Sequence, residues 1–74
     1  MGRHAAPTRP DGFTPREHEL LVLLSKGYRA TEAAQRMHIS KHTATDYLRQ
    51  ILTKLDASTQ AEAVYRAVKE GVIQ

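Results

Sequence analysis

Hydrophobic residues recur along this chain with the period of an α-helix, in segments separated by short polar or glycine-containing stretches. The clearest segment runs from Lys41 to about Leu55. Its apolar residues lie at i, i+3, i+4, i+7, i+8 and i+11, which places them on one side of a helix. They are Ala44, Tyr47, Leu48, Ile51, Leu52 and Leu55. No segment shows the two-residue alternation of a strand, so the pattern predicts an all-α fold with four helices.

Local sequence also predicts where the first three helices begin and end. Thr14, Pro15 and Glu17 form a capping box for the first helix, and Gly27 provides its left-handed end. A short second helix is expected over residues 30–37, without a clear N-terminal cap unless Thr31 caps a shorter one. A brief turn leads to Ser40, which is a favourable N-cap for the third helix.

The fourth helix is expected to start at a second capping box, Thr59 to Glu62, and to end at Gly71. We expect it to bury four residues, namely Ala61, Val64, Ala67 and Val68. Residues 1–12 include Pro7, Pro10 and Gly12 and show no periodicity, which predicts a flexible N-terminal arm before a domain over residues 13–74. Arg3, His4 and Arg9 in this arm either contact a phosphate backbone or form a solvated tail.

Composition narrows the possible functions. The 74 residues allow one small domain, and the absence of cysteine excludes a disulfide, a thiolate nucleophile and a zinc finger. Lys and Arg number 11 against 8 Asp and Glu, a mild positive balance that permits binding to a polyanion without requiring it. No apolar run approaches a membrane span and no signal sequence is evident, so we expect a cytoplasmic protein without membrane contact.

A short helix, a three-residue turn and a longer capped helix are the outline of a helix-turn-helix. The expected outer face of the third helix carries hydrogen-bonding residues: His42, Asp46, Arg49 and Thr53, flanked by Thr45 and Gln50. The major groove of DNA, about 12 Å wide, accepts one helix with such side chains. Because any solvated helix has a polar face, this pattern alone leaves DNA binding open.

From Phe13 to Ile73 the chain resembles the DNA-binding domain of LuxR-type (GerE-like) bacterial transcription regulators. The matching stretches are residues 13–17 (FTPRE), 23–27 (LLSKG), 32–34 (EAA), 39–43 (Ile39-Ser40 with Thr43), 51–55 (ILTKL) and 61–64 (AEAV). The resemblance implies a four-helix fold whose third helix enters the major groove of double-stranded DNA. It also implies a homodimer, usually through the last helix, and here Tyr65, Val68 and Val72 are the predicted contacts.

Transferred by position, the resemblance makes Thr45, Asp46 and Arg49 base readers, and His42 joins them on the same face. Thr43, Tyr47 and Lys54 fall where the family touches phosphates, and the hydroxyl and amide groups of Ser40, Gln50 and Thr53 are expected to hold the backbone too. The chain departs from the family by having His42, Thr45 and Tyr47 where lysine, a basic residue and histidine are frequent. Asp46 also places an anion opposite a polyanion, so non-specific phosphate attraction should be weak.

Asp46 and Arg49 suggest a particular reading. A carboxylate can accept a hydrogen bond from cytosine N4, and an arginine can bind guanine O6 and N7. The two residues are three apart on one helix face, so they can also pair with each other. We therefore expect a G·C pair in the half-site.

Other functions are weaker readings of the same residues. His38 and His42 are four apart, but Ser40 caps a new helix between them, so no metal site is expected. Glu17 is accounted for by the cap, while Glu19 and Glu32 read as ordinary surface charges, so neither an enzyme nor a cofactor is expected. The main alternative is a protein-interaction module that docks on RNA polymerase or another regulator. The promoter-reading end of a sigma factor shares the fold but fits these motifs less well.

Overall fold

A computed structural model describes residues 9–74 and contains four helices in that range. These are α1 (Pro15–Ser25), α2 (Ala30–Met37), α3 (Lys41–Leu55) and α4 (Gln60–Lys69). The predicted all-α, four-helix fold is confirmed, and no strand occurs among the described residues. Within residues 9–74, none of the helices has the length and hydrophobicity needed to cross a membrane.

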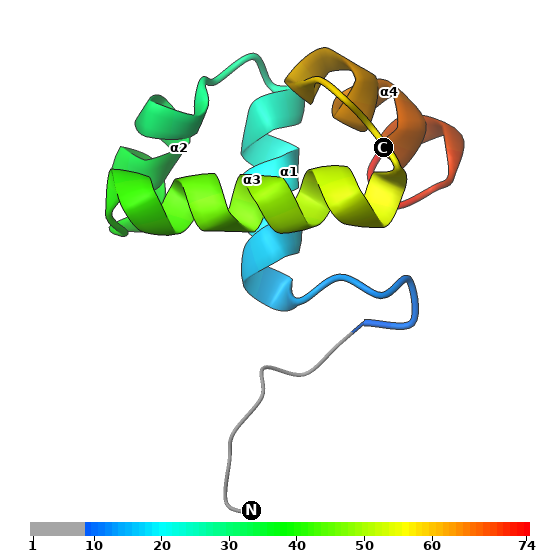
Figure 1. Ribbon diagram of the computed structural model, residues 1–74, viewed down its shortest axis with the longest axis horizontal. Helices are drawn as coiled ribbons and strands as arrows, with labels where there is room; N and C mark the ends of the chain where they lie inside the picture. Colours follow the sequence, from blue (N-terminus) through cyan, green and yellow to red (C-terminus); the bar gives the residue numbers. More distant parts are fainter. Residues whose placement is uncertain (1–8) are drawn as a thin grey trace, which may run out of the picture.

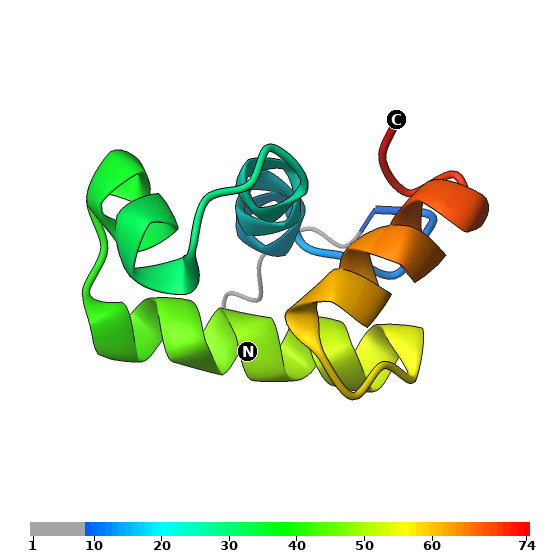
Figure 2. The same cartoon turned by 90° about the horizontal axis from the view of Figure 1, so that it is seen from above.

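Three helices pack against one side of the longest helix. Figure 1 shows α1 crossing behind α3, with α2 at one end of α3 and α4 at the other. The view from above in Figure 2 places α1, α2 and α4 together on one side of α3, and the opposite side of α3 faces away from them. This arrangement leaves a long helical surface open to a partner.

The helix starts follow the predicted caps with two changes. Thr14 Oγ1 accepts the Glu17 N–H at 3.2 Å, and Glu17 Oε1 accepts the Thr14 N–H at 3.0 Å, so the first capping box is complete. At α4 the Thr59 hydroxyl accepts the Glu62 N–H at 3.1 Å, but the Glu62 carboxylate accepts the Ser58 N–H at 2.8 Å instead of the Thr59 N–H.

The cap of α2 comes from Glu32, which was predicted to be an ordinary surface charge. Helix α2 begins after Arg29, and Glu32 Oε1 accepts the Arg29 N–H at 2.8 Å. Thr31 lies inside the helix and does not cap a shorter one. Glu32 therefore supplies the reciprocal half of a capping box at a start that has no hydroxyl.

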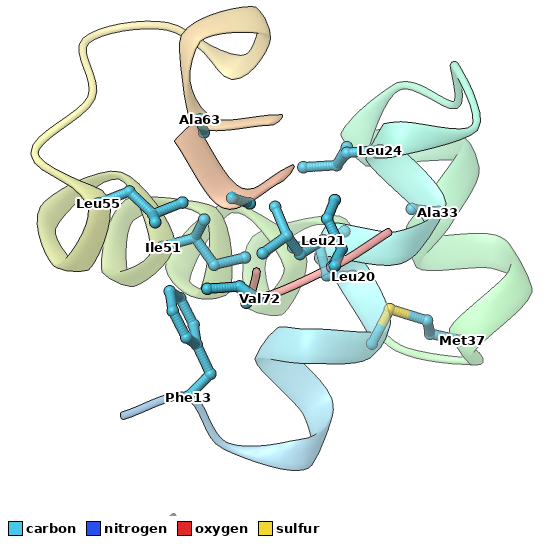
Figure 3. Packing of buried hydrophobic residues seen from close by; sticks show 12 residues of the cluster. Phe13, Leu20, Leu21, Leu24, Ala33, Met37, Ile51, Leu55, Ala63 and Val72 are labelled. Atoms are coloured by element: carbon cyan, nitrogen blue, oxygen red, sulfur yellow. The ribbon is translucent and has the colours of Figure 1, made fainter. Parts of the chain in front are cut away.

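The core lies where α1, α3 and α4 meet. Leu20, Leu21 and Ile51 are fully buried at its centre, and Figure 3 shows Phe13 and Val72 closing it from the chain ends. The predicted apolar stripe of α3 is confirmed, with Ala44, Ile51 and Leu55 buried and Tyr47, Leu48 and Leu52 half-buried.

The predicted inner face of α4 is partly wrong. Ala67 is buried and Val64 packs against the core, but Ala61 is exposed and Val68 is 49% exposed. Ala63 takes the inner position in their place. Four residues of small volume do not define the direction of a helix stripe well, so the rotation of α4 was misjudged.

Part of the predicted arm is folded. The Gly12 N–H donates to Arg9 O and the Arg9 N–H donates to Phe13 O, each at 2.8 Å, so residues 9–12 make a turn against the start of the domain. Arg9 also pairs with Asp11 at 3.1 Å. Arg3 and His4, the other candidate phosphate contacts of the arm, lie outside the described residues.

Candidate nucleic-acid interface

The turn between α2 and α3 is fixed by backbone and hydroxyl contacts. His38 ends α2 in the left-handed conformation (φ 58°), and the Ile39 N–H donates to Ala34 O at 3.0 Å. Ser40 then starts α3, because its Oγ accepts the Thr43 N–H at 3.0 Å and donates to Thr43 Oγ1 at 2.9 Å. Ala34 and Ala44 are buried, and their small side chains allow the two helices to approach closely. These features define a helix-turn-helix.

Arg16 attaches this turn to α1. Its guanidinium donates to Met37 O at 3.0 Å, at the C-terminal end of α2, and pairs with Glu19 at 2.9 Å. A cation at the last carbonyls of a helix satisfies acceptors that the helix cannot satisfy itself. This contact could not be predicted from the sequence, because Arg16 and Met37 are 21 residues apart and no local motif links them.

Three of the four predicted base readers form one charged cluster on the open side of α3. Arg49 Nη1 lies 3.0 Å from Asp46 Oδ1, and His42 Nε2 lies 3.5 Å from Asp46 Oδ2. The side chains of His42 and Arg49 are 86% and 69% exposed. The predicted pairing of Asp46 with Arg49 is confirmed, and the contact with His42 was not foreseen.

Two threonines of α3 donate their hydroxyl hydrogens to carbonyl groups of the same helix. Thr45 Oγ1 donates to Lys41 O and Thr53 Oγ1 donates to Arg49 O, each at 3.0 Å. In this state each hydroxyl can still accept a hydrogen bond, and each methyl group is available for apolar contact. Thr45, the fourth predicted base reader, is exposed beside the charged cluster.

The predicted phosphate contacts differ in their availability. Gln50 and Thr53 are exposed, while Thr43 and Tyr47 are half-buried. Lys54 turns toward α1, where its Nζ lies 2.5 Å from Glu17 Oε1 and 5.5 Å from the centre of the Phe13 ring. Its charge is therefore paired within the domain, although the side chain stays 30% exposed, and it is less available to a phosphate than the charge of a free lysine.

The predicted dimer contacts lie on α4 and beyond its end. Tyr65 and Val68 are 63% and 49% exposed, and they are the two large hydrophobic side chains exposed among the described residues. Lys69 Nζ lies 5.8 Å from the centre of the Tyr65 ring. Val72 is only 6% exposed and belongs to the core, so it offers almost no surface to a second chain.

Curated relatives are similar in sequence to most of the chain. The transcriptional activator protein ExaE of Pseudomonas putida is 34% identical over 73 residues, which is 99% of this chain and 34% of that protein. The response regulator protein VraR of Staphylococcus aureus is 38% identical over 62 residues, which is 84% of this chain and 30% of that protein. The chain thus spans about a third of the length of these relatives.

Solved structures share the fold. The transcription factor GerE matches with a TM-score of 0.79 at 24% identity, covering 89% of this chain and 97% of GerE. A complex of Vibrio cholera VqmA with ligand and DNA matches with a TM-score of 0.76 at 28% identity, covering 96% of this chain and 31% of VqmA. Residues 11–67 of the chain match the family described as bacterial regulatory proteins, luxR family. Together with the helix-turn-helix and the relatives above, this match shows that the chain belongs to the luxR (GerE) family, whose helix-turn-helix domains are found in DNA-binding transcription regulators.

Proposed function

We propose that this domain reads DNA sequence by placing the open side of α3 in the major groove. The observation that carries the proposal is the one-sidedness of α3. All three other helices pack on its apolar stripe (Figure 2), while its other side presents polar groups without a large apolar residue. The 15 residues of α3 form a rod of about 22 Å, which fits along a groove about 12 Å wide.

Contacts to base edges come from His42, Thr45, Asp46 and Arg49 in this proposal. Arg49 shares only Nη1 with Asp46, so its other guanidinium donors remain for guanine O6 and N7. The pairing with Asp46 holds the arginine on the outer face and so reduces the side-chain conformational entropy that Arg49 loses when it binds a base. A G·C pair in the half-site is the expected target, and Asp46 can in addition accept from cytosine N4.

Contacts to phosphates come from the polar groups around this centre. Ser40, Thr43 and the first N–H groups of α3 lie at its N-terminal end, and Tyr47, Gln50 and Thr53 lie along its length. Such contacts fix the register of a protein on the duplex without reading sequence.

The active unit in this proposal is a homodimer joined through Tyr65 and Val68. Figure 1 shows α4 at the end of the molecule away from α2, so a partner at α4 leaves the outer side of α3 uncovered. A two-fold dimer reads two half-sites, whose spacing follows from the distance between the two copies of α3.

A second function, docking on RNA polymerase or another regulator with little DNA affinity, is favoured by one feature. Asp46 offsets Arg49 on the face of α3, and Lys54 is engaged by Glu17, so this face is poorer in free positive charge than its lysine and arginine content suggests. Salt dependence distinguishes the two functions, because each phosphate contact contributes about 0.9 to the slope of log affinity against log salt.

The test is selection from random duplex DNA with the wild-type chain, Arg49→Ala, Arg49→Lys and the control Arg29→Ala. Arg29 is an exposed arginine just before α2, so its replacement removes a charge without touching α3. We expect a G-containing motif for the wild type and for Arg29→Ala. Arg49→Ala should lose the base preference at one base pair, a discrimination worth about 1–3 kcal/mol. Arg49→Lys should keep most of the affinity for DNA, because the charge remains, but should lose much of the base preference, because lysine cannot make the bidentate contact.

Recovery of the same motif with Arg49→Ala would refute the assigned role of Arg49. If the wild type yields no motif even at low salt, the DNA-reading function fails, and a protein partner becomes the function to pursue.

A further inference from the structure

Asp46 is contacted from both directions along α3, and each neighbour uses a different carboxylate oxygen. Arg49 lies at Oδ1 and His42 at Oδ2, 3.0 Å and 3.5 Å away. Arg49 and Asp46 offset each other in charge at any pH near neutrality. The net charge of the cluster is therefore set by whether His42 carries a proton. Histidine is the side chain whose charge ordinarily changes between pH 5 and 8.

We propose that His42 is a proton-linked DNA contact, whose imidazole takes up a proton as α3 meets DNA and then pairs fully with Asp46. The inference rests on the proposed function, because it assumes that the outer side of α3 faces a duplex. Its consequence is regulatory: DNA affinity rises as pH falls from about 8 to about 6.

His42 has cationic neighbours as well as Asp46. On its own helix, His42 has Lys41 beside it and lies in the first turn, where the helix dipole is positive. At the C-terminal end of α2 lies His38, while the Arg36 guanidinium of that helix lies 4.2 Å from the centre of the Tyr28 ring. Arg16 and Glu19 of α1 reach that end as a pair. Among residues 9–74, Asp46 is the acidic group that forms an ion pair with His42.

Phosphates change this balance. A duplex places a row of negative charges around the groove that α3 enters, which favours the imidazolium form of a histidine on that surface. The imidazolium also cancels the unfavourable approach of Asp46 to the phosphates. Proton uptake and DNA binding therefore favour each other, and by linkage the affinity increases as protons become available.

The first test measures protons directly. Calorimetric titration of the selected duplex is carried out near pH 6.5 in two buffers of different ionisation enthalpy, and the difference in binding enthalpy gives the number of protons taken up. We expect a substantial fraction of one proton per chain. The affinity for the duplex should rise as the pH is lowered from 8 to 6, by up to about tenfold per pH unit for one linked proton.

Three variants assign the proton. His42→Gln should remove the uptake and the pH dependence, and it should fold normally because this side chain is 86% exposed. Asp46→Asn should reduce the uptake by removing the anion beside the imidazole. His38→Asn is the matched control, an exposed histidine of the adjacent turn with positive φ that asparagine tolerates, and it should behave like the wild type.

Each outcome supports or overturns the inference. Unchanged proton uptake in His42→Gln, or loss of uptake in His38→Asn alone, overturns it. DNA binding by the wild type without any proton uptake also overturns it and leaves the proposed function intact. Absence of DNA binding at every pH and salt concentration overturns both.

Discussion

At the scale of single residues, Glu17 has the most demanding position in the domain. It is the buried charged residue among those described, at 5% exposure, and its carboxylate serves two purposes. Oε1 accepts the Thr14 N–H that starts α1 and also binds Lys54 Nζ near the end of α3. The capping box was evident in the sequence, whereas the ion pair was not, because 37 residues separate its partners.

This pair makes a graded prediction for stability. Glu17→Gln keeps the shape and the acceptor for Thr14 but loses the ion pair, so we expect the free energy of unfolding to fall by about 1–3 kcal/mol. Lys54→Met should cost more, because it leaves the Glu17 carboxylate buried without its cation. Urea denaturation at neutral pH checks both, and the double variant should lose less than the sum of the two. Wild-type stability in Lys54→Met would contradict this account.

Two other residues adopt a conformation that their side chains disfavour. His38 and Asp56 end α2 and α3 with φ of 58° and 53°, in the left-handed region that glycine usually occupies at helix ends. Periodicity predicts both helix ends but not these left-handed residues, since neither is glycine. Aspartate and histidine are among the non-glycine residues that adopt this conformation most often.

Asp56 allows that strain to be measured. Asp56→Gly removes the steric conflict of Cβ with the backbone while making the unfolded chain more flexible, and at a positive φ the first effect is larger. We expect the free energy of unfolding to rise by roughly 0.5–1 kcal/mol. Glycine at a nearby exposed position without a positive φ, Ser58→Gly, is the control and should give no gain. A destabilised Asp56→Gly would show that the carboxylate has a structural role not visible in its contacts.

At the scale of helices, the sequence predicted what local rules govern. The bounds of α2 and α3 and the Ser40 and Thr59 caps follow from periodicity and from hydroxyls placed before apolar runs. The rotation of α4 did not follow, because its buried positions are alanines that differ little from the exposed Ala61. Hydrophobic contrast along a helix, rather than hydrophobicity itself, determines whether its inner face can be predicted.

Helix α4 also provides the clearest effect of pH on stability. The Ser58 N–H and then Arg66 hydrogen-bond to the Glu62 carboxylate and hold the pKa of Glu62 below its ordinary value. A lowered pKa in the folded state stabilises the fold above the ordinary pKa, and this contribution is lost as pH falls from about 4.5 through the folded value. Glu62→Gln should therefore be less stable than the wild type at pH 7, and the two should converge in acid.

Thermal unfolding across pH 2 to 7, a range chosen to bracket about two units either side of an ordinary carboxyl pKa, checks this expectation. Glu70→Gln is the control, since Glu70 lies just past α4 and forms no ion pair among the described residues. A constant difference between Glu62→Gln and the wild type at every pH would contradict the assigned cause.

At the scale of the whole molecule, the residues that hold the recognition surface come from distant parts of the chain. Arg16 fixes the end of α2, Glu17 fixes the end of α3, and His18 Nε2 lies 3.2 Å from Val72 O of the C-terminal segment. One turn of α1 thus connects three parts of the domain. The sequence predicted the outer face of α3 from periodicity, but this scaffold behind it depends on tertiary packing that no local pattern encodes.

The same scale decides whether the domain acts as a dimer. Tyr65 and Val68 are exposed on α4, so changing them should not affect folding by more than about 0.5 kcal/mol. If they form the centre of a two-fold interface, Tyr65→Ala and Val68→Asp should each weaken dimerisation by about tenfold or more, equivalent to about 1.4 kcal/mol. Sedimentation measurements with and without a two-half-site duplex test this, and Glu70→Gln serves again as the surface control.

Binding of each variant to a single half-site should stay close to that of the wild type, since α3 is untouched. Unchanged association in both variants would exclude this face of α4 and direct the search for the dimer contact to another surface.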